Sequence, residues 1–361
     1  MKAKHLLFAL FALSLGATAC ENDNIDSQQP SEPKTYTIKL RTTGEVDVNY
    51  EPLTRFTPDD RDLYGVQVLH KPATTGSYEC YAYGLFDSLD NAELEVTENY
   101  IYWIQVWMVD DGKDKVFCDS ILIDQNYYLG YDQPFRGKNK YNGAATESIT
   151  QLTNQFTYDS DRYFTGISGG GYLHDIMTSF KAKDGKTYTY PEDVDYYFGT
   201  IGNYTPTEDG TTLSIYLKRM AFGLKVVVGD YLDNGKITLT TFGGEHKYTF
   251  TPENRVLEKT YSYMSGLNSN YHDWYDNDDL SQTYRDFSLD FLWTKADGTT
   301  VDWKPFTARF YRLKQTVFNL EYYGEDGVLG NNYFEAHYED TPIEEAYKSY
   351  TFGKEQDDYY W

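Results

Sequence analysis

The sequence predicts an all-β protein built from antiparallel β-sandwiches, with a few short helices. Tyrosine is unusually frequent: the chain has 37 Tyr, 20 Phe and 6 Trp, so aromatic residues make up 17% of it. Large aromatic side chains favour strands, so we expect most tyrosines to lie in the core or to pair across strands. Short runs of β-forming residues recur between Asp-Gly and Gly-Gly turns, a pattern typical of a sandwich.

Residues 1–19 have the features of a secretory signal. Lys2 and Lys4 precede an apolar run from Leu6 to Leu15, and small residues follow up to Cys20. That order is typical of a signal peptide, and the run is too short for a bilayer, which needs about 20 helical residues. Ala17-Thr18-Ala19-Cys20 resembles the bacterial lipobox, although Ala17 stands where Leu is usual. We therefore expect lipidation of Cys20, with an ordinary signal and a chance Cys as the alternative.

The net negative charge of the chain limits the classes of partner that it can bind. The formal net charge is −24, and it becomes −26 once Lys2 and Lys4 are removed with the signal. Such a surface repels nucleic acid and anionic membranes, so we exclude nucleic-acid binding. Residues 20–34 are polar and acidic and predict a flexible, lipidated leash. This stretch resembles the surface-export signal of Bacteroidetes lipoproteins, which predicts a lipid-anchored protein of the outer membrane and cell surface. A solvated linker is the alternative interpretation.

Strand-like runs fill the first half of the mature chain. The runs are Thr35–Arg41, Leu63–His70, Tyr78–Phe86, Tyr100–Val109 and Val116–Ile123. Thr35–Arg41 alternates between polar and apolar residues, and Tyr100–Val109 is the most apolar run. Short helices are expected within Tyr141–Phe156 and Tyr172–Phe180.

A domain boundary is expected near residue 205, because Asn203–Gly210 is rich in turn-forming residues. Residues 35–205 would form an N-terminal sandwich and residues 206–361 a C-terminal one. The expected strands of the second half are Thr212–Arg219, Leu224–Val228, Lys236–Phe242, Lys247–Thr251, Phe287–Trp293, Trp303–Tyr311 and Thr316–Tyr323.

Cys80 and Cys118 are the two cysteines besides Cys20. An exported protein can join such a pair in a disulfide. The distance between their Cβ atoms decides whether it forms. Two separately buried thiols are therefore the alternative to a bridge.

Three features together resemble the fimbrillin-like surface lipoproteins of Bacteroidales. The first is the lipoprotein signal with its leash. The second is the first strand running into Thr42–Val46 and then Pro52–Arg55. The third is Asp195–Gly199, followed after a turn by Leu213–Val226. As an order of elements, the resemblance covers most of the mature chain.

The resemblance implies two tandem sandwiches of transthyretin-like or immunoglobulin-like type, in a stalk, tip or anchor subunit of surface fimbriae. Stalk subunits of that family polymerise by strand addition after proteolysis at an arginine, which here would be Arg41 or Arg55; the alternative is that both stay uncut. The donor strand would be Tyr347–Trp361, although its acidic cluster at residues 354–358 suits a buried strand poorly and fits a tip or non-polymerising relative. Partners would be other fimbrial subunits and host or bacterial surface ligands.

Two motifs resemble sites of catalysis or metal binding. Gly166–Gly170 matches G-x-S-x-G around Ser168, but that pattern needs a strand-turn-helix elbow in an α/β sheet, so we interpret it as a flexible turn. Asp273, Asp276 and Asp278 could supply oxygen ligands to calcium, but their spacing is not that of an EF-hand and a solvated acidic loop is the simpler interpretation. We expect no enzymatic activity and no cofactor.

A second function class is a surface glycan-binding lipoprotein. Exposed aromatic rings can stack on sugars, and the candidates are Trp274, Trp293, Trp303 and Trp361. An exposed row of these rings would favour this alternative, whereas a terminal strand at a sheet edge would favour strand addition.

Overall fold

The computed structural model describes residues 33–352, with gaps at 45–59, 91, 124, 132–134, 136, 140–146, 149, 159–161, 165–179, 182–185, 231, 233, 264–283, 303–304, 324–332 and 342–347. Within these residues nearly all regular structure is strand, which confirms the all-β class. The helical segments described there are α1 (Gly112–Lys115) and the 3-10 turn η2 (Phe242–Gly244). None of the helices in the described part is long and apolar enough to cross a membrane.

The short helix expected within Tyr141–Phe156 does not occur in the part of that range that the structure describes. Residues 141–146 and 149 lie outside the described residues, and the rest contains the short strands β9 (Glu147–Ser148) and β10 (Thr150–Gln151). β10 pairs with a neighbouring strand at Tyr131, so tertiary pairing overrides the weak local helix preference. Of the second expected helix, residues 172–179 lie outside the described residues.

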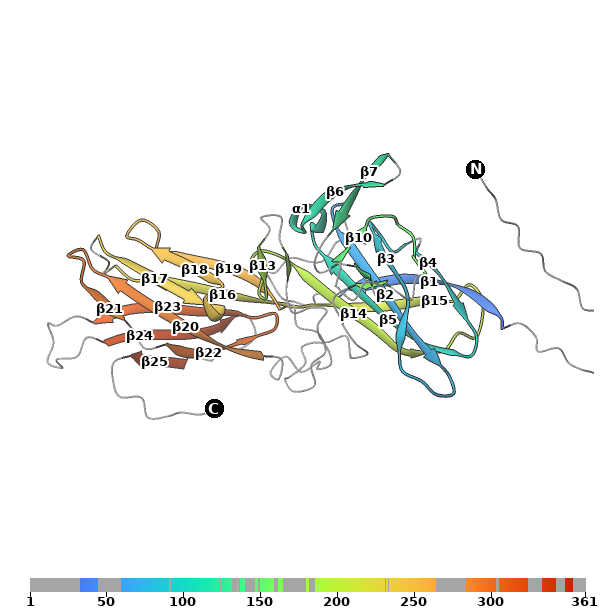
Figure 1. Ribbon diagram of the computed structural model, residues 1–361. Helices are drawn as coiled ribbons and strands as arrows, with labels where there is room; N and C mark the ends of the chain where they lie inside the picture. The colour runs from blue at the N-terminus through green and yellow to red at the C-terminus, as the bar shows by residue number, and fades with distance from the viewer. Residues whose placement is uncertain are drawn as a thin grey trace, which may run out of the picture. The chain divides into compact units, whose positions relative to one another are not determined.

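A seven-stranded sheet is the centre of the first half of the protein (Figure 1). Its strands, in spatial order, are β3 (Glu79–Phe86), β2 (Leu63–Pro72), β5 (Tyr100–Val109), β14 (Tyr196–Tyr204), β15 (Thr212–Arg219), β1 (Thr35–Gly44) and β4 (Glu93–Thr97). All neighbours are antiparallel except β1 and β15, which run parallel.

The two ends of this sheet meet, because tyrosine side chains bridge from β3 to β4. The Tyr81 hydroxyl donates to the Glu95 carbonyl at 2.8 Å, and the Glu95 amide donates to the Tyr158 hydroxyl at 2.8 Å. Thr157, next to Tyr158, pairs with Tyr83 on β3. The curled sheet therefore encloses a core of its own. That core includes Ile38, Leu40, Val66, Val68, Leu94, Val96, Ile104, Val106, Ile215 and Leu217.

The outer face of the curled sheet is covered by a long excursion between β5 and β14. Its strands are β6 (Cys118–Ile123), β7 (Asn126–Tyr131) and β10 in one sheet, β8 (Gly137–Asn139), β9 and β11 (Arg162–Phe164) in a second, and the pair β12 (Phe180–Lys181) and β13 (Thr187–Tyr188). Tyr131 and Phe135 of the excursion are buried in the same cluster as Trp107 of β5.

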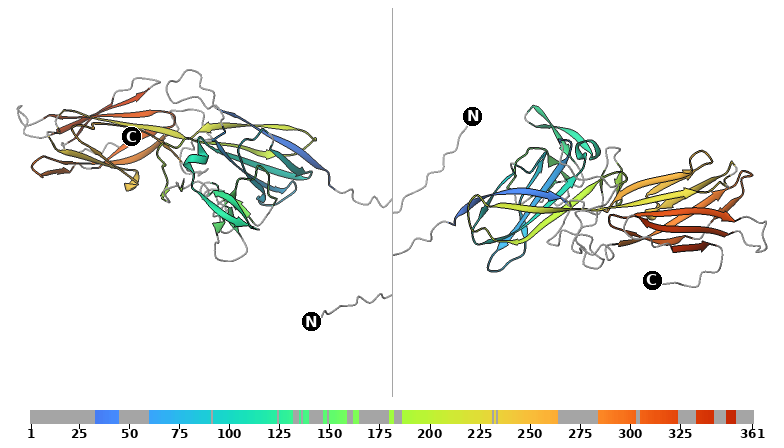
Figure 2. Two further views of the ribbon diagram at one scale, coloured as in Figure 1. Left: turned by 90° about the horizontal axis from the view of Figure 1, so that it is seen from above. Right: turned by 180° about the vertical axis from the view of Figure 1, so that it is seen from behind.

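The second half is a sandwich of two five-stranded sheets (Figure 2). One contains β19 (Val256–Ser262), β16 (Ala221–Val228), β23 (Gln315–Tyr323), β24 (Tyr333–Thr341) and β25 (Lys348–Phe352). The other contains β18 (His246–Phe250), β17 (Lys236–Thr241), β20 (Tyr284–Thr294), β21 (Thr300–Asp302) and β22 (Phe306–Tyr311). Aromatic rings fill the space between them; Phe222 contacts Phe242, Phe287 and Phe310 with ring centroids 5.5–5.6 Å apart.

Sheet membership changes at Met220, between β15 and β16. β15 still pairs with β14 and β1 of the first half, whereas β16 pairs with β19 and β23 of the second. The domain division expected at residue 205 stays a prediction about independent folding units.

Two glycines of β14 allow a matched test of this packing. A Cβ on Gly199 would lie 2.6 Å from the Tyr216 carbonyl oxygen and 2.8 Å from the Ile215 side chain, whereas one on Gly202 would meet nothing within 4 Å. We expect Gly199→Ala to lower the free energy of unfolding by about 1–3 kcal/mol, because backbone and core must shift. Gly202→Ala should be neutral or slightly stabilising. Urea unfolding checks both, and equal effects would contradict the close approach of β14 and β15.

Candidate functional site

The first strand of the described chain occupies an unusual place. The first half of β1 pairs antiparallel with β4, from Thr35 to Lys39, and its second half pairs parallel with β15, from Lys39 to Gly44. The strand that follows it in sequence, β2, is not one of its neighbours. β1 therefore fills a gap between two strands that are far apart in the chain.

Backbone and side-chain hydrogen bonds hold β1 along its length. The Thr37 amide donates to Asp209 Oδ1 at 2.7 Å, and the Thr37 carbonyl accepts from the Gly210 amide at 2.8 Å. Further along, the Leu40 amide donates to the Ala92 carbonyl at 3.1 Å. Removal of β1 would leave these groups and the ladders of β4 and β15 without their partners, which is costly in a buried position.

Alternate side chains of β1 enter the core of the curled sheet. Ile38 and Leu40 are fully buried, Tyr36 packs against the same core, and Lys39 and Arg41 are exposed. Full burial of an Ile or Leu side chain contributes about 1.5–3 kcal/mol. A strand that replaced β1 would need apolar side chains at the same alternate positions to fill the sites of Ile38 and Leu40.

The two arginines named as maturation sites differ in their setting. Arg41 has an exposed side chain, but its backbone is paired with Ser214 of β15. Arg55 lies outside the described residues. Cutting after Arg41 therefore requires that β1 first leave the sheet, since proteases bind an extended, unpaired backbone.

The last described strand, β25, also lies at a sheet edge. β25 pairs with β24 through Phe334–Tyr338 and is the outermost strand of its sheet. It covers residues 348–352 of the expected donor segment, and the rest of that segment lies outside the described residues.

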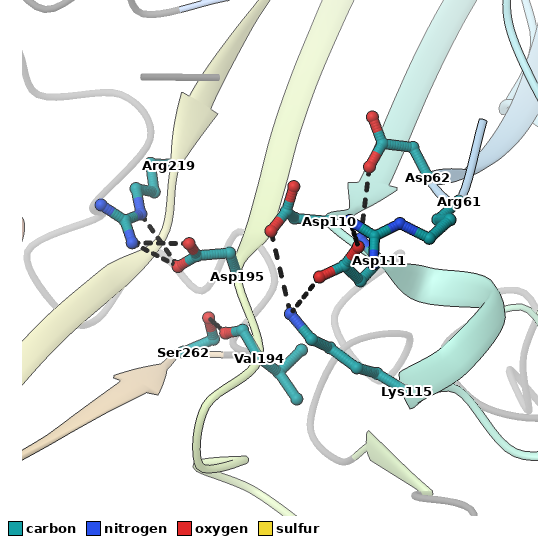
Figure 3. Close-up of polar contacts among 9 residues, drawn as sticks. All are labelled: Arg61, Asp62, Asp110, Asp111, Lys115, Val194, Asp195, Arg219 and Ser262. Carbon is teal, nitrogen blue, oxygen red and sulfur yellow. Dashed lines mark hydrogen bonds and ion pairs between the residues drawn. The ribbon is translucent and has the colours of Figure 1, made fainter. Parts of the chain in front are cut away.

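A polar network joins strand ends of the first half to the second half (Figure 3). Arg219, at the end of β15, donates to both carboxylate oxygens of Asp195 at 2.6 Å, and both side chains are largely buried. Across the junction, the Ser262 hydroxyl donates to the Val194 carbonyl, and buried Arg312 donates to the Arg219 carbonyl at 2.9 Å. Bidentate, charge-assisted bonds of this kind are the strong ones.

The same network extends to the turn that contains α1. Asp111 accepts from Arg61 at 2.8 Å, and the Asp111 amide donates to Asp62 at 3.2 Å. Lys115 lies between the carboxylates of Asp110 and Asp111, at 3.8 and 3.7 Å (Figure 3). These contacts hold the residues that precede β2 against the residues that follow β5. The Asp110 amide also donates to the Asp195 carbonyl at 2.9 Å, which holds this turn beside the start of β14.

A second polar cluster centres on Glu192, which precedes β14 and pairs with Tyr261 of β19. Glu192 accepts from the Tyr248 hydroxyl at 2.6 Å and forms an ion pair with Lys259. Burial by itself raises the pKa of Glu192, but the bonds from Lys259 and Tyr248 and the charges of Lys259 and His246 outweigh burial and lower it. Burial raises the pKa of Tyr248, so its hydroxyl stays a donor.

The residues expected for lipidation, catalysis, calcium binding and a disulfide are only partly within the described chain. Cys20, Ser168, Asp273, Asp276 and Asp278 lie outside the described residues. Cys80 and Cys118, both described, are not joined by a disulfide. Cys80 is buried on β3 and Cys118 is partly buried at the start of β6. Within the described chain, no group of three or more His, Cys, Asp or Glu residues could hold a metal ion.

Of the four tryptophans named for the glycan-binding alternative, only Trp293 lies within the described residues, and it forms no exposed platform. Trp293 is only 5% exposed and belongs to the core of the second sandwich, since it faces inward from β20. Trp274, Trp303 and Trp361 lie outside the described residues.

Sequence reasoning missed the pairing of Asp195 with Arg219. Both residues lie in the segments quoted for the family resemblance, and β14 and β15 pair Tyr197 with Arg219. A hairpin alignment of those two strands would have placed the acid beside the base. The exposed side chains of the β6–β7 hairpin were also missed, although its apolar runs are visible in the sequence.

No family model matches this chain, and no curated protein matches it. Solved structures similar to it include a fimbrial assembly protein from Parabacteroides distasonis, with 11% identity, a TM-score of 0.31, and coverage of 85% of this chain and 96% of that one. The fimbrial anchor protein Mfa2 from Porphyromonas gingivalis has 9% identity, a TM-score of 0.31, and coverage of 86% and 97%. A protein described as a candidate adhesin from Bacteroides ovatus has 12% identity, a TM-score of 0.30, and coverage of 81% and 87%.

These structures come from the group of bacteria and the kind of protein that the sequence resemblance named. Likeness at this level assigns no function to the chain.

The Arg219–Asp195 pair gives a prediction about stability. Arg219→Met leaves the largely buried Asp195 carboxylate without its cation, so we expect a loss of about 3–5 kcal/mol in the free energy of unfolding. The matched control is Arg255→Met, because the partner of Arg255, Asp230, is 90% exposed. That control should cost less than about 1 kcal/mol. Chemical denaturation measures both, and similar losses would contradict a stabilising role for the junction.

Glu192 gives a prediction about pH. Because its pKa is lowered in the folded protein, the carboxylate contributes stability above its ordinary value of 4.5, and the contribution is lost as pH falls through the lower folded value. Glu192→Gln should therefore be less stable than the wild type at pH 7, with the difference shrinking below pH 4.5. Thermal unfolding over a pH series measures this. Glu253→Gln, at an exposed turn, is the control for removing a surface carboxylate, and an equal pH trend in both variants would contradict the role of Glu192.

Proposed function

We propose that this chain is a lipid-anchored, non-enzymatic subunit of a bacterial surface fimbria that assembles with other subunits by β-strand addition. The observation that supports it is the place of β1, between β15 and β4 and apart from its neighbours in sequence. Loss of β1 would expose an apolar groove lined by backbone hydrogen-bonding groups. Such a groove accepts an extended strand from another chain.

Charge and the predicted signal agree with this role. A net charge of −24 keeps the chain away from nucleic acid and anionic lipid, so attachment to the outer membrane would depend on the lipid at Cys20. The folded domains would carry the adhesive or structural role at the cell surface.

The donor in this proposal is Tyr347–Trp361, of which β25 is the described part. β25 is an edge strand at the end of the described chain, so it can leave its sheet by breaking one ladder. For the glycan-binding alternative, Trp293 is buried and offers no platform, whereas Tyr127 and Tyr128 are exposed aromatic rings.

Limited trypsin digestion tests the proposal on the full mature chain with Cys20→Ser, which stays unlipidated. We expect cutting in the segment after β1, at Arg55 before Arg41, because the Arg41 backbone is paired. Loss of the β1 fragment should then lead to higher oligomers, followed by light scattering and mass spectrometry. Arg55→Gln and Arg41→Gln together should abolish both cutting there and assembly.

Arg255→Gln is the control for removing an arginine elsewhere, and it should assemble like the wild type. Resistance at both sites would contradict strand exchange triggered by cleavage. Cutting that releases β1 without any growth in size would contradict the assembly step and favour a tip, anchor or glycan-binding role.

A further inference from the structure

Acidic residues lie on both sides of the position that β1 occupies. β1 lies between β4 and β15 (Figure 1). Glu93 and Glu95 belong to β4, Glu98 follows it, and Glu208 and Asp209 lie in the turn before β15. The segments 93–98 and 208–216 contain no Lys or Arg. The neighbours of β1 along its first half therefore carry negative charge only.

Two of these carboxylates bind the backbone at the start of β1. Glu98 Oε1 accepts from the Lys34 amide at 3.0 Å, and Asp209 Oδ1 accepts from the Thr37 amide at 2.7 Å. Hydrogen bonds from an amide to a carboxylate are stronger than those between neutral groups. A strand that replaced β1 would have amides of its own, so these two carboxylates would hold it whatever its side chains, unless Pro stood at the position of Thr37.

The carboxylates of β4 face side chains of β1. Glu93 is paired with Lys39 and Glu95 with Thr37, and paired residues of neighbouring strands share a face. The Lys39 ammonium lies 3.6 Å from Glu93 Oε1, and both side chains are about half exposed. Residues 34–44 contain two Lys and one Arg and no acid. β1 is therefore a basic strand between acidic neighbours.

Loss of β1 would leave these five carboxylates without the three bases of residues 34–44. Carboxylates that lie close together repel one another, so the vacated position would attract a basic strand and disfavour an acidic one. On the inner side, the sites of Ile38 and Leu40 are 0% and 1% exposed, and larger side chains would overpack them. Charge on the outer face and side-chain size on the inner face thus select the incoming strand independently.

The C-terminal segment of the chain meets these two requirements only in part. Residues 347–361 contain two bases and three acids, and their apolar side chains are all aromatic. Within β25 these rings alternate at Tyr350 and Phe352, which are larger than the two aliphatic side chains of β1. Thr351 between them would bring no base to Glu93. The chain's own donor would therefore fill the position of β1 less well than β1 does.

We propose that the position of β1 prefers a basic strand with aliphatic side chains at alternate positions, supplied by a different subunit, over the C-terminal segment of this chain. The inference rests on the proposed function, because β1 must leave before another strand can enter. It adds the chemistry of the partner, which has a base opposite Glu93 and aliphatic side chains at the sites of Ile38 and Leu40. Unlike subunits would then join more tightly at this site than copies of this chain.

Competition between peptides for a nicked chain tests the proposal. The protein is the full mature chain with Cys20→Ser and a recognition site for a specific protease between β1 and β2, so the nick does not depend on Arg41 or Arg55. A labelled peptide of residues 34–44 reports binding through fluorescence anisotropy. We expect the unlabelled 34–44 peptide to compete about tenfold or more better than a peptide of residues 347–361, because affinity differs with charge and fit.

A charge reversal locates the preference. A 34–44 peptide with Lys39→Glu should bind about fivefold or more weakly at low salt, and the difference should shrink at high salt because salt screens exposed charges. Glu93→Lys in the protein should reverse the order of the two peptides. Glu93→Gln should weaken binding of the unchanged peptide. Glu253→Gln removes the same charge at an exposed turn and should leave that binding unchanged.

Three outcomes would overturn this inference and leave strand addition standing. They are equal binding of the unchanged and Lys39→Glu peptides at low salt, equal effects of Glu93→Gln and Glu253→Gln, and binding of the 347–361 peptide as tight as that of the 34–44 peptide. Failure of every peptide to enter the nicked chain, the 34–44 peptide included, would contradict the proposed function and this inference with it.

Discussion

The pairing of β1 with both β4 and β15 is the constraint on which the first half of the structure depends. Backbone groups in a buried sheet must have hydrogen-bonding partners, and β4 and β15 find theirs in β1. The core of the curled sheet is filled on this side by Ile38 and Leu40. The same dependence makes the position suitable for a strand from another chain, because an incoming strand would restore the ladders and the core together.

Two polar networks then connect the halves. Asp195, before β14, and Arg219, at the end of β15, form a bidentate pair, while Glu192 pairs with β19 of the second half. The short segment from Glu192 to Asp195 thus bonds to both sides of the junction. Loss of either network would leave a buried charge without its partner, so both networks fix strand ends in place.

The edge strands of the sheets differ in whether other segments of the chain bond to them. Segments of its own chain cover β3 and β19, and the hydroxyls of Tyr81 and Tyr158 bond to the backbone of β4. β25 and β6 lie at outer edges instead. Strands at the edge of a sheet are where another chain can add through backbone hydrogen bonds.

By itself the sequence determined the all-β class, most strand positions and the inward side chains of β1, because strand patterning is local: Ile38 and Leu40 alternate with Lys39 and Arg41 whatever lies beside them. It did not determine the neighbours of β1, the pairing of Asp195 with Arg219, the burial of Trp293 or the strand at Thr150–Gln151. Each of these depends on contacts between segments distant in the chain. Pairing across such distances is decided by how the sheets close and pack, so only the tertiary structure could settle it.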